Sequence, residues 1–100
     1  MNVSLINHGT TGELLLQGRL DSNASYEIED IFKQVAERFD FIVLDLAGLE
    51  YISSSGLRTL KNLHIALKKK GGELTIKNTG RNVMEVMEIT GMAGLLNFIE

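Results

Sequence analysis

Three consecutive serines, Ser53, Ser54 and Ser55, stand directly before Gly56 and the start of a helical pattern. Serine is a common helix N-cap, because its hydroxyl accepts a hydrogen bond from a free backbone N–H of the first turn. The same position favours a phosphate, since the helix dipole places partial positive charge there. One serine is enough for a cap, so the run predicts either a structural cap or a phosphorylation switch.

An apolar run over residues 41–46, interrupted by Asp45, precedes these serines. Such runs are typical of central strands that are covered on both faces. We expect a strand that ends near Asp45 and a short loop that leads to Ser53. Asp45 should then lie on the same edge of the sheet as the serines, the edge where binding sites gather in open α/β sheets.

The sequence lacks the motifs of several common enzyme sites. It contains no GxxxxGK[ST] or GxGxxG phosphate loop and no GxSxG nucleophile elbow. His8 and His64 lie far apart in the chain, and we expect each to be a packing residue rather than a metal ligand. A small enzyme or nucleotide-binding domain is therefore the least favoured class, and we predict no enzymatic activity, no cofactor and no metal site.

Composition narrows the remaining classes. A length of 100 residues predicts one domain over residues 1–100. A net charge of −3 argues against nucleic acid, and the basic run Lys68–Lys70 suits the end of a helix better than an anionic ligand. Cysteine is absent, and neither a signal peptide nor an apolar stretch of about 20 residues is visible. We expect a cytoplasmic protein with no direct membrane insertion.

Hydrophobic periodicity divides the first half of the chain into elements. A turn over residues 8–12 joins a strand over residues 3–7 to a second strand over 13–20, which indicates a hairpin. Three candidate caps, Asp21, Ser22 and Asn23, then precede an amphipathic helix. Its apolar positions follow the i, i+3, i+4 pattern and are Ile28, Ile31, Phe32, Val35 and Phe39.

The second half alternates helices with strands. After the central strand, the pattern predicts a helix over residues 57–67, a strand over 73–77, a helix over 83–90 that ends at Gly91, and a short helix over 93–96. The order is β-β-α-β-α-β-α with a short C-terminal helix, which predicts an α/β fold with a mixed sheet of four to five strands. Because the helices are few, one face or one edge of the sheet should remain free for a partner.

The order and spacing of these segments resemble the STAS domain family, named for sulfate transporters and anti-sigma factor antagonists. The resemblance rests on Gly18–Asp21 before the first helix, on Val43–Leu46 with Leu49 and Ile52, and on Ser53–Leu57, Gly71–Leu74 and Met87–Gly91. The family motif carries Asp where this chain has Ser53, which removes a carboxylate beside the acceptor hydroxyl.

The resemblance implies a bacterial signalling phosphoprotein that regulates transcription through protein–protein contacts. In anti-sigma factor antagonists, a serine kinase that also sequesters a sigma factor phosphorylates the last serine of the motif. That residue is Ser55 here, ahead of Ser54 and Ser53. The unphosphorylated antagonist binds this kinase and frees the sigma factor. The implied partner-binding residues are Asp21, Ser22, Asp45, Ser53, Ser54, Ser55, Gly56 and Arg58.

The alternative within the same family is a scaffold. The chain would then be an unphosphorylated STAS subunit of a stress-signalling or lipid-transport complex, and its serines would only cap the helix. The hydroxyl at position 55 favours the switch, because scaffold members carry Ala or another residue there. A weak homodimer is compatible with either reading.

Overall fold

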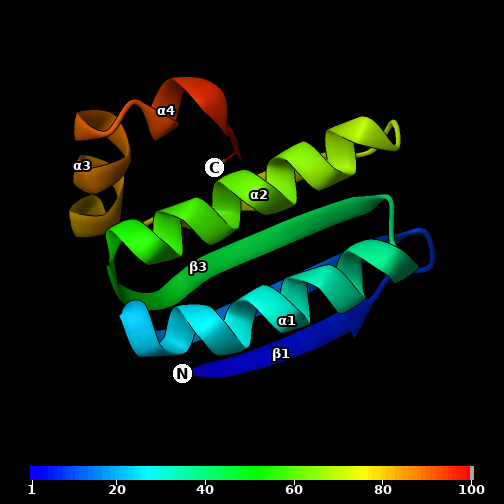
Figure 1. The fold of residues 1–100 in the computed structure, drawn as a ribbon, viewed down its shortest axis with the longest axis horizontal. Helices are drawn as coiled ribbons and strands as arrows, with labels where there is room; N and C mark the ends of the chain where they lie inside the picture. The colour runs from blue at the N-terminus through cyan, green and yellow to red at the C-terminus, as the bar shows by residue number, and fades with distance from the viewer. Residues whose placement is uncertain (100) are drawn as a thin grey trace.

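The computed structural model describes residues 1–99 (Figure 1). Their elements, in chain order, are β1 (Asn2–Asn7), β2 (Thr11–Leu20), α1 (Ser22–Arg38), β3 (Phe41–Ile52), α2 (Ser54–Lys69), β4 (Glu73–Lys77), α3 (Arg81–Ile89), α4 (Met92–Leu95) and β5 (Asn97–Ile99). The predicted order is confirmed, and the C-terminal segment adds a fifth strand.

The five strands form one sheet in the order β1-β2-β3-β4-β5. β1 and β2 are the predicted antiparallel hairpin, and the pairs β2–β3, β3–β4 and β4–β5 are parallel. The sheet is therefore mixed, as the sequence pattern predicts. In this arrangement β1 and β5 are the two edge strands.

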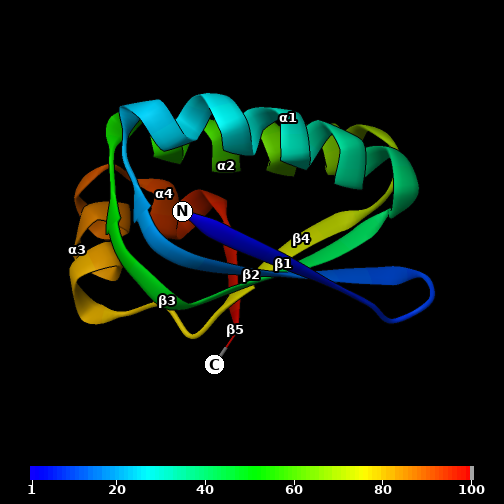
Figure 2. The same ribbon diagram turned by 90° about the horizontal axis from the view of Figure 1, so that it is seen from below.

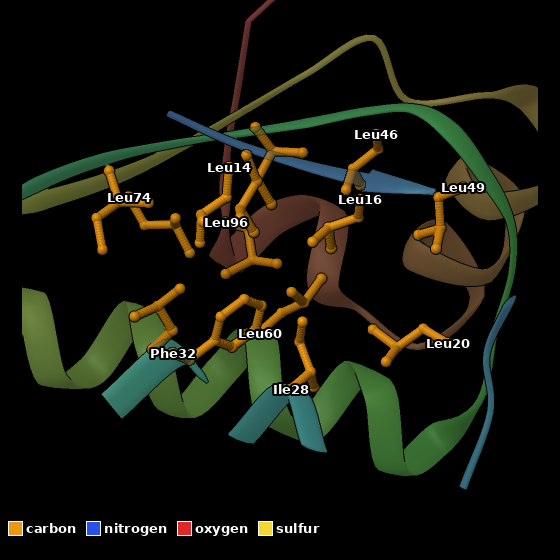
Figure 3. Close-up of a cluster of buried hydrophobic side chains, with 14 of the residues drawn as sticks. Leu14, Leu16, Leu20, Ile28, Phe32, Leu46, Leu49, Leu60, Leu74 and Leu96 are labelled. Atoms are coloured by element: carbon orange, nitrogen blue, oxygen red, sulfur yellow. The ribbon is translucent and has the colours of Figure 1, made fainter. Parts of the chain in front are cut away.

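α1 and α2 lie side by side over one face of the sheet (Figures 1 and 2). Leucines of the sheet meet the apolar stripes of both helices in one core (Figure 3). Its fully buried side chains include Leu14, Leu16, Leu44, Leu46, Leu74 and Ile76 from the strands and Ile28, Leu60 and Leu67 from the helices. No helix of the described residues packs on the opposite face of the sheet.

The prediction that the central strand is covered on both faces is wrong. Buried and accessible positions alternate along residues 41–46, and the Phe41 side chain is 46% exposed. The apolar run therefore indicates a strand whose second face is partly apolar, because side chains of a strand point to alternate faces of the sheet.

The prediction of a loop after Asp45 is also wrong, because β3 continues to Ile52. Its second half pairs with β2 through register shifts between Leu15 and Gln17 and between Gly18 and Arg19. Such shifts bend the paired strands without ending them. Sequence alone makes Ala47 and Gly48 resemble loop residues, whereas pairing with β2 keeps them in the strand.

The basic run lies at the end of α2, as predicted. Lys68 and Lys69 occupy the last turn, and Lys70 follows as the C-cap residue. The Lys70 ammonium lies 3.1 Å from the Asp40 carboxylate and also donates to the Ala36 carbonyl, so it joins the ends of α1 and α2. None of the helices within residues 1–99 is long and apolar enough to cross a membrane.

Candidate functional site

The starts of α1 and α2 are brought together by the strands that precede them. Leu20, the last residue of β2, is in register with Ile52, the last residue of β3. The Ser53 N–H donates to the Leu20 carbonyl at 2.9 Å, so the chain leaves both strands at the same point. Because α1 and α2 begin directly after these strands, their N-termini lie next to each other (Figure 1).

Asp21 caps α1. It has an extended backbone, and its Oδ1 accepts a hydrogen bond from the Ala24 N–H at 2.9 Å. The buried Ser25 hydroxyl donates to the Asp21 carbonyl at 2.7 Å and reinforces the same turn. Of the three cap candidates, Asp21 is therefore the cap, and Ser22 is an exposed residue of the first turn.

Ser53 caps α2. Its Oγ accepts a hydrogen bond from the Gly56 N–H at 3.1 Å, while Ser54 and Ser55 are the first two residues of the helix. Ser54 is exposed and Ser55 is half-buried. Within residues 1–99, neither of these two hydroxyls makes a hydrogen bond, so the capping function is fulfilled by Ser53 alone.

Gly56 is buried and fixes how closely α2 approaches the sheet. A Cβ at this position would lie 2.8 Å from Leu20 Cγ, 2.9 Å from Ile52 Cγ1 and 3.0 Å from the Leu20 carbonyl oxygen. The glycine in the serine motif therefore serves packing within the domain. It lies beneath the surface that a partner can reach.

Ser55 lies in a shallow cleft between α1 and α2. The residues that line this cleft are Ser22, Ser25, Tyr26, Glu29, Ser55, Arg58 and Thr59. Arg58 is exposed, and the Tyr26 side chain is 77% exposed. Of the predicted binding residues, the structure gathers Ser22, Ser55 and Arg58 around this cleft, with Asp21 and Ser53 as the caps of the two helices.

Tyr26 and Glu29 were missed by the sequence reasoning, although they line the same cleft. A signal for them exists in the helical spacing. Tyr26 follows Ser22 by four residues and Glu29 follows Tyr26 by three, so all three share one face of α1. An exposed tyrosine on that face is of interest, because tyrosine is enriched where proteins bind each other.

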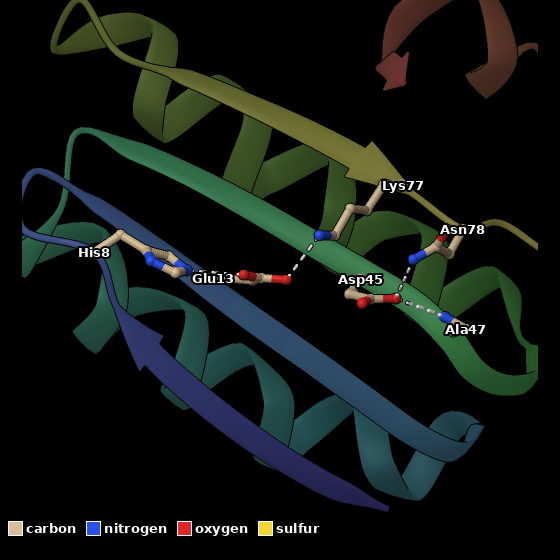
Figure 4. A network of polar contacts seen from close by, with 6 residues as sticks. All are labelled: His8, Glu13, Asp45, Ala47, Lys77 and Asn78. Atoms are coloured by element: carbon tan, nitrogen blue, oxygen red, sulfur yellow. Dashed lines mark hydrogen bonds and ion pairs between the residues drawn. The ribbon is translucent and has the colours of Figure 1, made fainter. Parts of the chain in front are cut away.

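The structure places Asp45 in β3, away from the serine edge where the sequence predicts it, and its predicted role in partner binding stays a prediction. It lies in the middle of β3, on the face of the sheet that the helices leave free (Figure 4). Its Oδ1 accepts hydrogen bonds from the Asn78 amide and the Ala47 N–H, both at 3.0 Å. Ile52 lies seven positions further along the chain, which amounts to roughly 23 Å along an extended strand.

A second polar cluster occupies the same free face. The Glu13 carboxylate lies 2.9 Å from both the Lys77 ammonium and the His8 Nε2 (Figure 4). Hydrogen bonds from Lys77 and then His8 lower the pKa of Glu13, and the hydrogen bond to Glu13 raises the pKa of Lys77. Glu13 of β2 and Lys77 of β4 therefore form an ion pair across β3, which lies between these two strands. Within residues 1–99, no group of three or more His, Cys, Asp or Glu side chains is placed to hold a metal ion.

The domain also matches known proteins. The STAS domain family matches residues 3–100. The protein BtrV of Bordetella bronchiseptica, assigned as an anti-sigma factor antagonist, is 36% identical over 81 residues, which cover 80% of this chain and 70% of BtrV.

Solved structures show the same fold. The anti-sigma factor antagonist SpoIIAA in its unphosphorylated form has a TM-score of 0.85 at 19% identity, covering 99% of this chain and 89% of that one. The phosphorylated form of SpoIIAA from Bacillus has a TM-score of 0.77 at 18% identity, covering 99% and 92%. The chain therefore belongs to the STAS domain family and resembles its anti-sigma factor antagonists.

Proposed function

We propose that this protein is an anti-sigma factor antagonist that binds an anti-sigma factor with serine kinase activity and is switched off by phosphate on Ser55. The observation that carries the proposal is that Ser53 and Ser55 have different structural roles. Ser53 caps α2, and the Ser55 hydroxyl, without a hydrogen bond among the described residues, borders the cleft between α1 and α2. The proposal is consistent with SpoIIAA, which has been solved in unphosphorylated and phosphorylated forms.

A phosphate on Ser55 should be tolerated by the fold. It would add a charge of about −1.5 to −2 at neutral pH. At the second residue of α2 this charge faces the positive end of the helix dipole, which stabilises it by about 0.3–1 kcal/mol. The domain would therefore stay folded in both states of the switch.

The same charge should weaken partner binding strongly. A desolvated charge without a matching partner charge costs several kcal/mol at an interface. Since about 1.4 kcal/mol corresponds to a tenfold change in affinity, the loss amounts to orders of magnitude. The proposed contact surface consists of Ser22, Tyr26, Ser54, Ser55 and Arg58, which are accessible around the two helix starts.

Ser53 need not impair this switch. The family's Asp at this position would cap the helix, and Asp21 fills that same role at the start of α1. In this chain the Ser53 hydroxyl makes the equivalent hydrogen bond. What the substitution removes is a carboxylate beside the acceptor hydroxyl, so its effect should fall on recognition by the kinase.

Two steps test the proposal. Co-purification followed by mass spectrometry identifies the bound partner, which should be an anti-sigma factor with a serine kinase domain. Incubation with that kinase and ATP, followed by peptide mapping, should then place the phosphate on Ser55. Ser55→Ala should abolish labelling, and Ser54→Ala, the matched control one residue earlier, should retain it. Phosphate mainly on Ser53 or Ser54, or capture of transporter subunits alone, would support the scaffold alternative.

We further propose that the chain acts as one cytoplasmic domain without catalytic activity of its own. Its task would be to occupy or release the kinase. A cytoplasmic location is consistent with this proposal, because the kinase, the sigma factor and ATP are found there together.

A further inference from the structure

The two edges of the sheet differ in how they are protected. Within residues 1–99, β5 spans three residues, and a short edge strand offers little for another chain to pair with. β1 is six residues long and reads Asn-Val-Ser-Leu-Ile-Asn. It contains no charged residue and no proline, and it pairs with β2 without a register shift. The usual devices that keep an edge strand from pairing are therefore missing from β1.

The hydrogen-bond pattern of the hairpin shows which backbone groups of β1 are free. The His8 N–H donates to the Thr11 carbonyl at 2.9 Å, so these residues form a hydrogen-bonded pair. Hydrogen-bonded and non-hydrogen-bonded pairs alternate along an antiparallel ladder. In the observed register, the backbone groups of Val3, Leu5 and Asn7 then point away from the sheet.

Side chains beside this edge are partly apolar and accessible. Leu5 is 37% exposed and Ile6 is 44% exposed. Val3 and Leu5 border a hollow between β1 and α1, together with Ile31. A strand that paired with β1 would cover apolar surface on the helix side and on the free face at once.

We propose that β1 pairs with β1 of a second copy of this chain, so that two sheets join into one across a twofold axis. An antiparallel pair of identical strands is self-complementary, as an isologous interface requires. Because β1 carries no charge, the pairing places no like charges opposite each other. Contacts between other, charged surfaces of the two copies are disfavoured, because each copy carries a net charge of −3 and the two copies repel each other.

The alternation of side chains selects the register. A continuous sheet requires that opposite residues share a face, so the twofold axis must pass through a residue, and an axis through Ser4 or Leu5 gives the longest overlap of the six-residue strand. With Ser4 on the axis, Val3 of each copy lies opposite Leu5 of the other, an apolar pair on the helix side. With Leu5 on the axis, the two Leu5 side chains would form a single apolar pair, and each Val3 would lie opposite Asn7. The apolar pairing favours the register centred on Ser4.

Such a dimer should be weak. A six-residue strand is about 20 Å long, and interfaces that bury less than about 1,200 Å² are typical of transient complexes. We expect reversible association that sedimentation detects over a concentration series up to about 1 mM.

Lysine substitutions test the surface. Ser4 is exposed on the free face, so Ser4→Lys should leave the monomer folded while placing two ammonium groups on the axis. It should weaken dimerisation at least tenfold. Asn97→Lys, the matched charge on the other edge strand, should change it less than twofold. A wild-type protein that stays monomeric throughout the series, or equal weakening by both substitutions, would overturn the proposal.

A cysteine substitution tests the register, and the chain has no cysteine of its own to interfere. Opposite residues of a non-hydrogen-bonded pair have Cα atoms about 4.5 Å apart, within the range that a disulfide spans. Ser4→Cys should therefore form a covalent dimer under mild oxidation, whereas Asn97→Cys should not. Equal cross-linking of the two variants would contradict pairing through β1 even if a dimer is detected.

Discussion

The starts of α1 and α2 have the same backbone geometry but different chemistry. The caps Asp21 and Ser53 have φ angles of −87° and −88°, and each accepts a hydrogen bond from the N–H three residues later. The second residue of each helix is Asn23 in α1 and Ser55 in α2. Asn23 borders a hollow with Arg19 and Glu27, whereas Ser55 borders the cleft between the helices.

This comparison separates capping from signalling. Either a carboxylate or a hydroxyl can cap the helix, so the type of cap residue does not by itself indicate a role in regulation. Both second positions experience the same helix dipole, and therefore a negative charge should be equally acceptable to the fold at either one. Only at Ser55 does that charge enter the proposed contact surface.

The largest expected effect concerns a charge at the second helical position. Ser55→Asp should weaken binding of the anti-sigma factor by more than tenfold, because an unmatched charge at a desolvated interface costs several kcal/mol. Asn23→Asp places the same charge at the same position of α1 and should have little effect. Isothermal titration calorimetry measures both affinities, and thermal melts establish that both variants fold. Equal losses would show that net charge alone, and not the site, governs binding.

The next effect concerns the close approach of α2 to the sheet. Gly56→Ala should lower the free energy of unfolding by about 1–3 kcal/mol, since the new Cβ would press on Leu20 and Ile52. Gly94→Ala is the matched control, because a Cβ on Gly94 in α4 meets nothing within 4 Å. Urea denaturation should show no loss for this control. A tolerated Gly56→Ala would mean that α2 can shift without disturbing the core.

The caps should differ in strength. Asp21→Ala should cost about 1–2 kcal/mol of unfolding free energy and Ser53→Ala about 0.5–1 kcal/mol, because a charged acceptor makes the stronger hydrogen bond and also favours the helix dipole. Asp21→Asn keeps an acceptor without the charge and should therefore cost less than Asp21→Ala. Chemical denaturation gives the order, and a larger loss at Ser53 would contradict this account of the two helix starts.

The smallest expected change in stability follows from making the two caps alike. Ser53→Asp restores the family residue and should alter the free energy of unfolding by less than about 1 kcal/mol. It should nevertheless raise the rate of Ser55 phosphorylation in a matched kinase assay. If the rate is unchanged or lower, the kinase of this protein has adapted to serine at position 53.

Much of the fold follows from local pattern. The apolar spacing of α1, the hairpin before it and the helix that ends just before Gly91 are all visible in the sequence, because each depends on residues close to it along the chain. The length of β3 is not visible, because residues 47–52 remain extended through pairing with β2. The exposure of the Phe41 side chain is not visible either, because it depends on how many helices pack on the sheet.

The candidate site likewise has parts that the sequence predicts and parts that depend on how the elements pack. The serine motif and the cap at Asp21 are local signals, and they lead to the correct helix starts. The distance between Asp45 and the serines follows from the length of β3, which no local signal in the sequence indicates. Tyr26 and Glu29 required knowledge that α1 and α2 lie side by side, since only that contact forms the cleft they line.

The most direct test of the central claim compares two forms of the wild-type chain, with and without phosphate on Ser55. Calorimetric titration with the anti-sigma factor gives the two affinities, and a thermal melt of each form reports on folding. Phosphorylation should weaken binding by at least about 100-fold while the melting temperature stays nearly constant. Equal affinities of the two folded forms would contradict the switch and leave the serines as a helix cap in a scaffold protein.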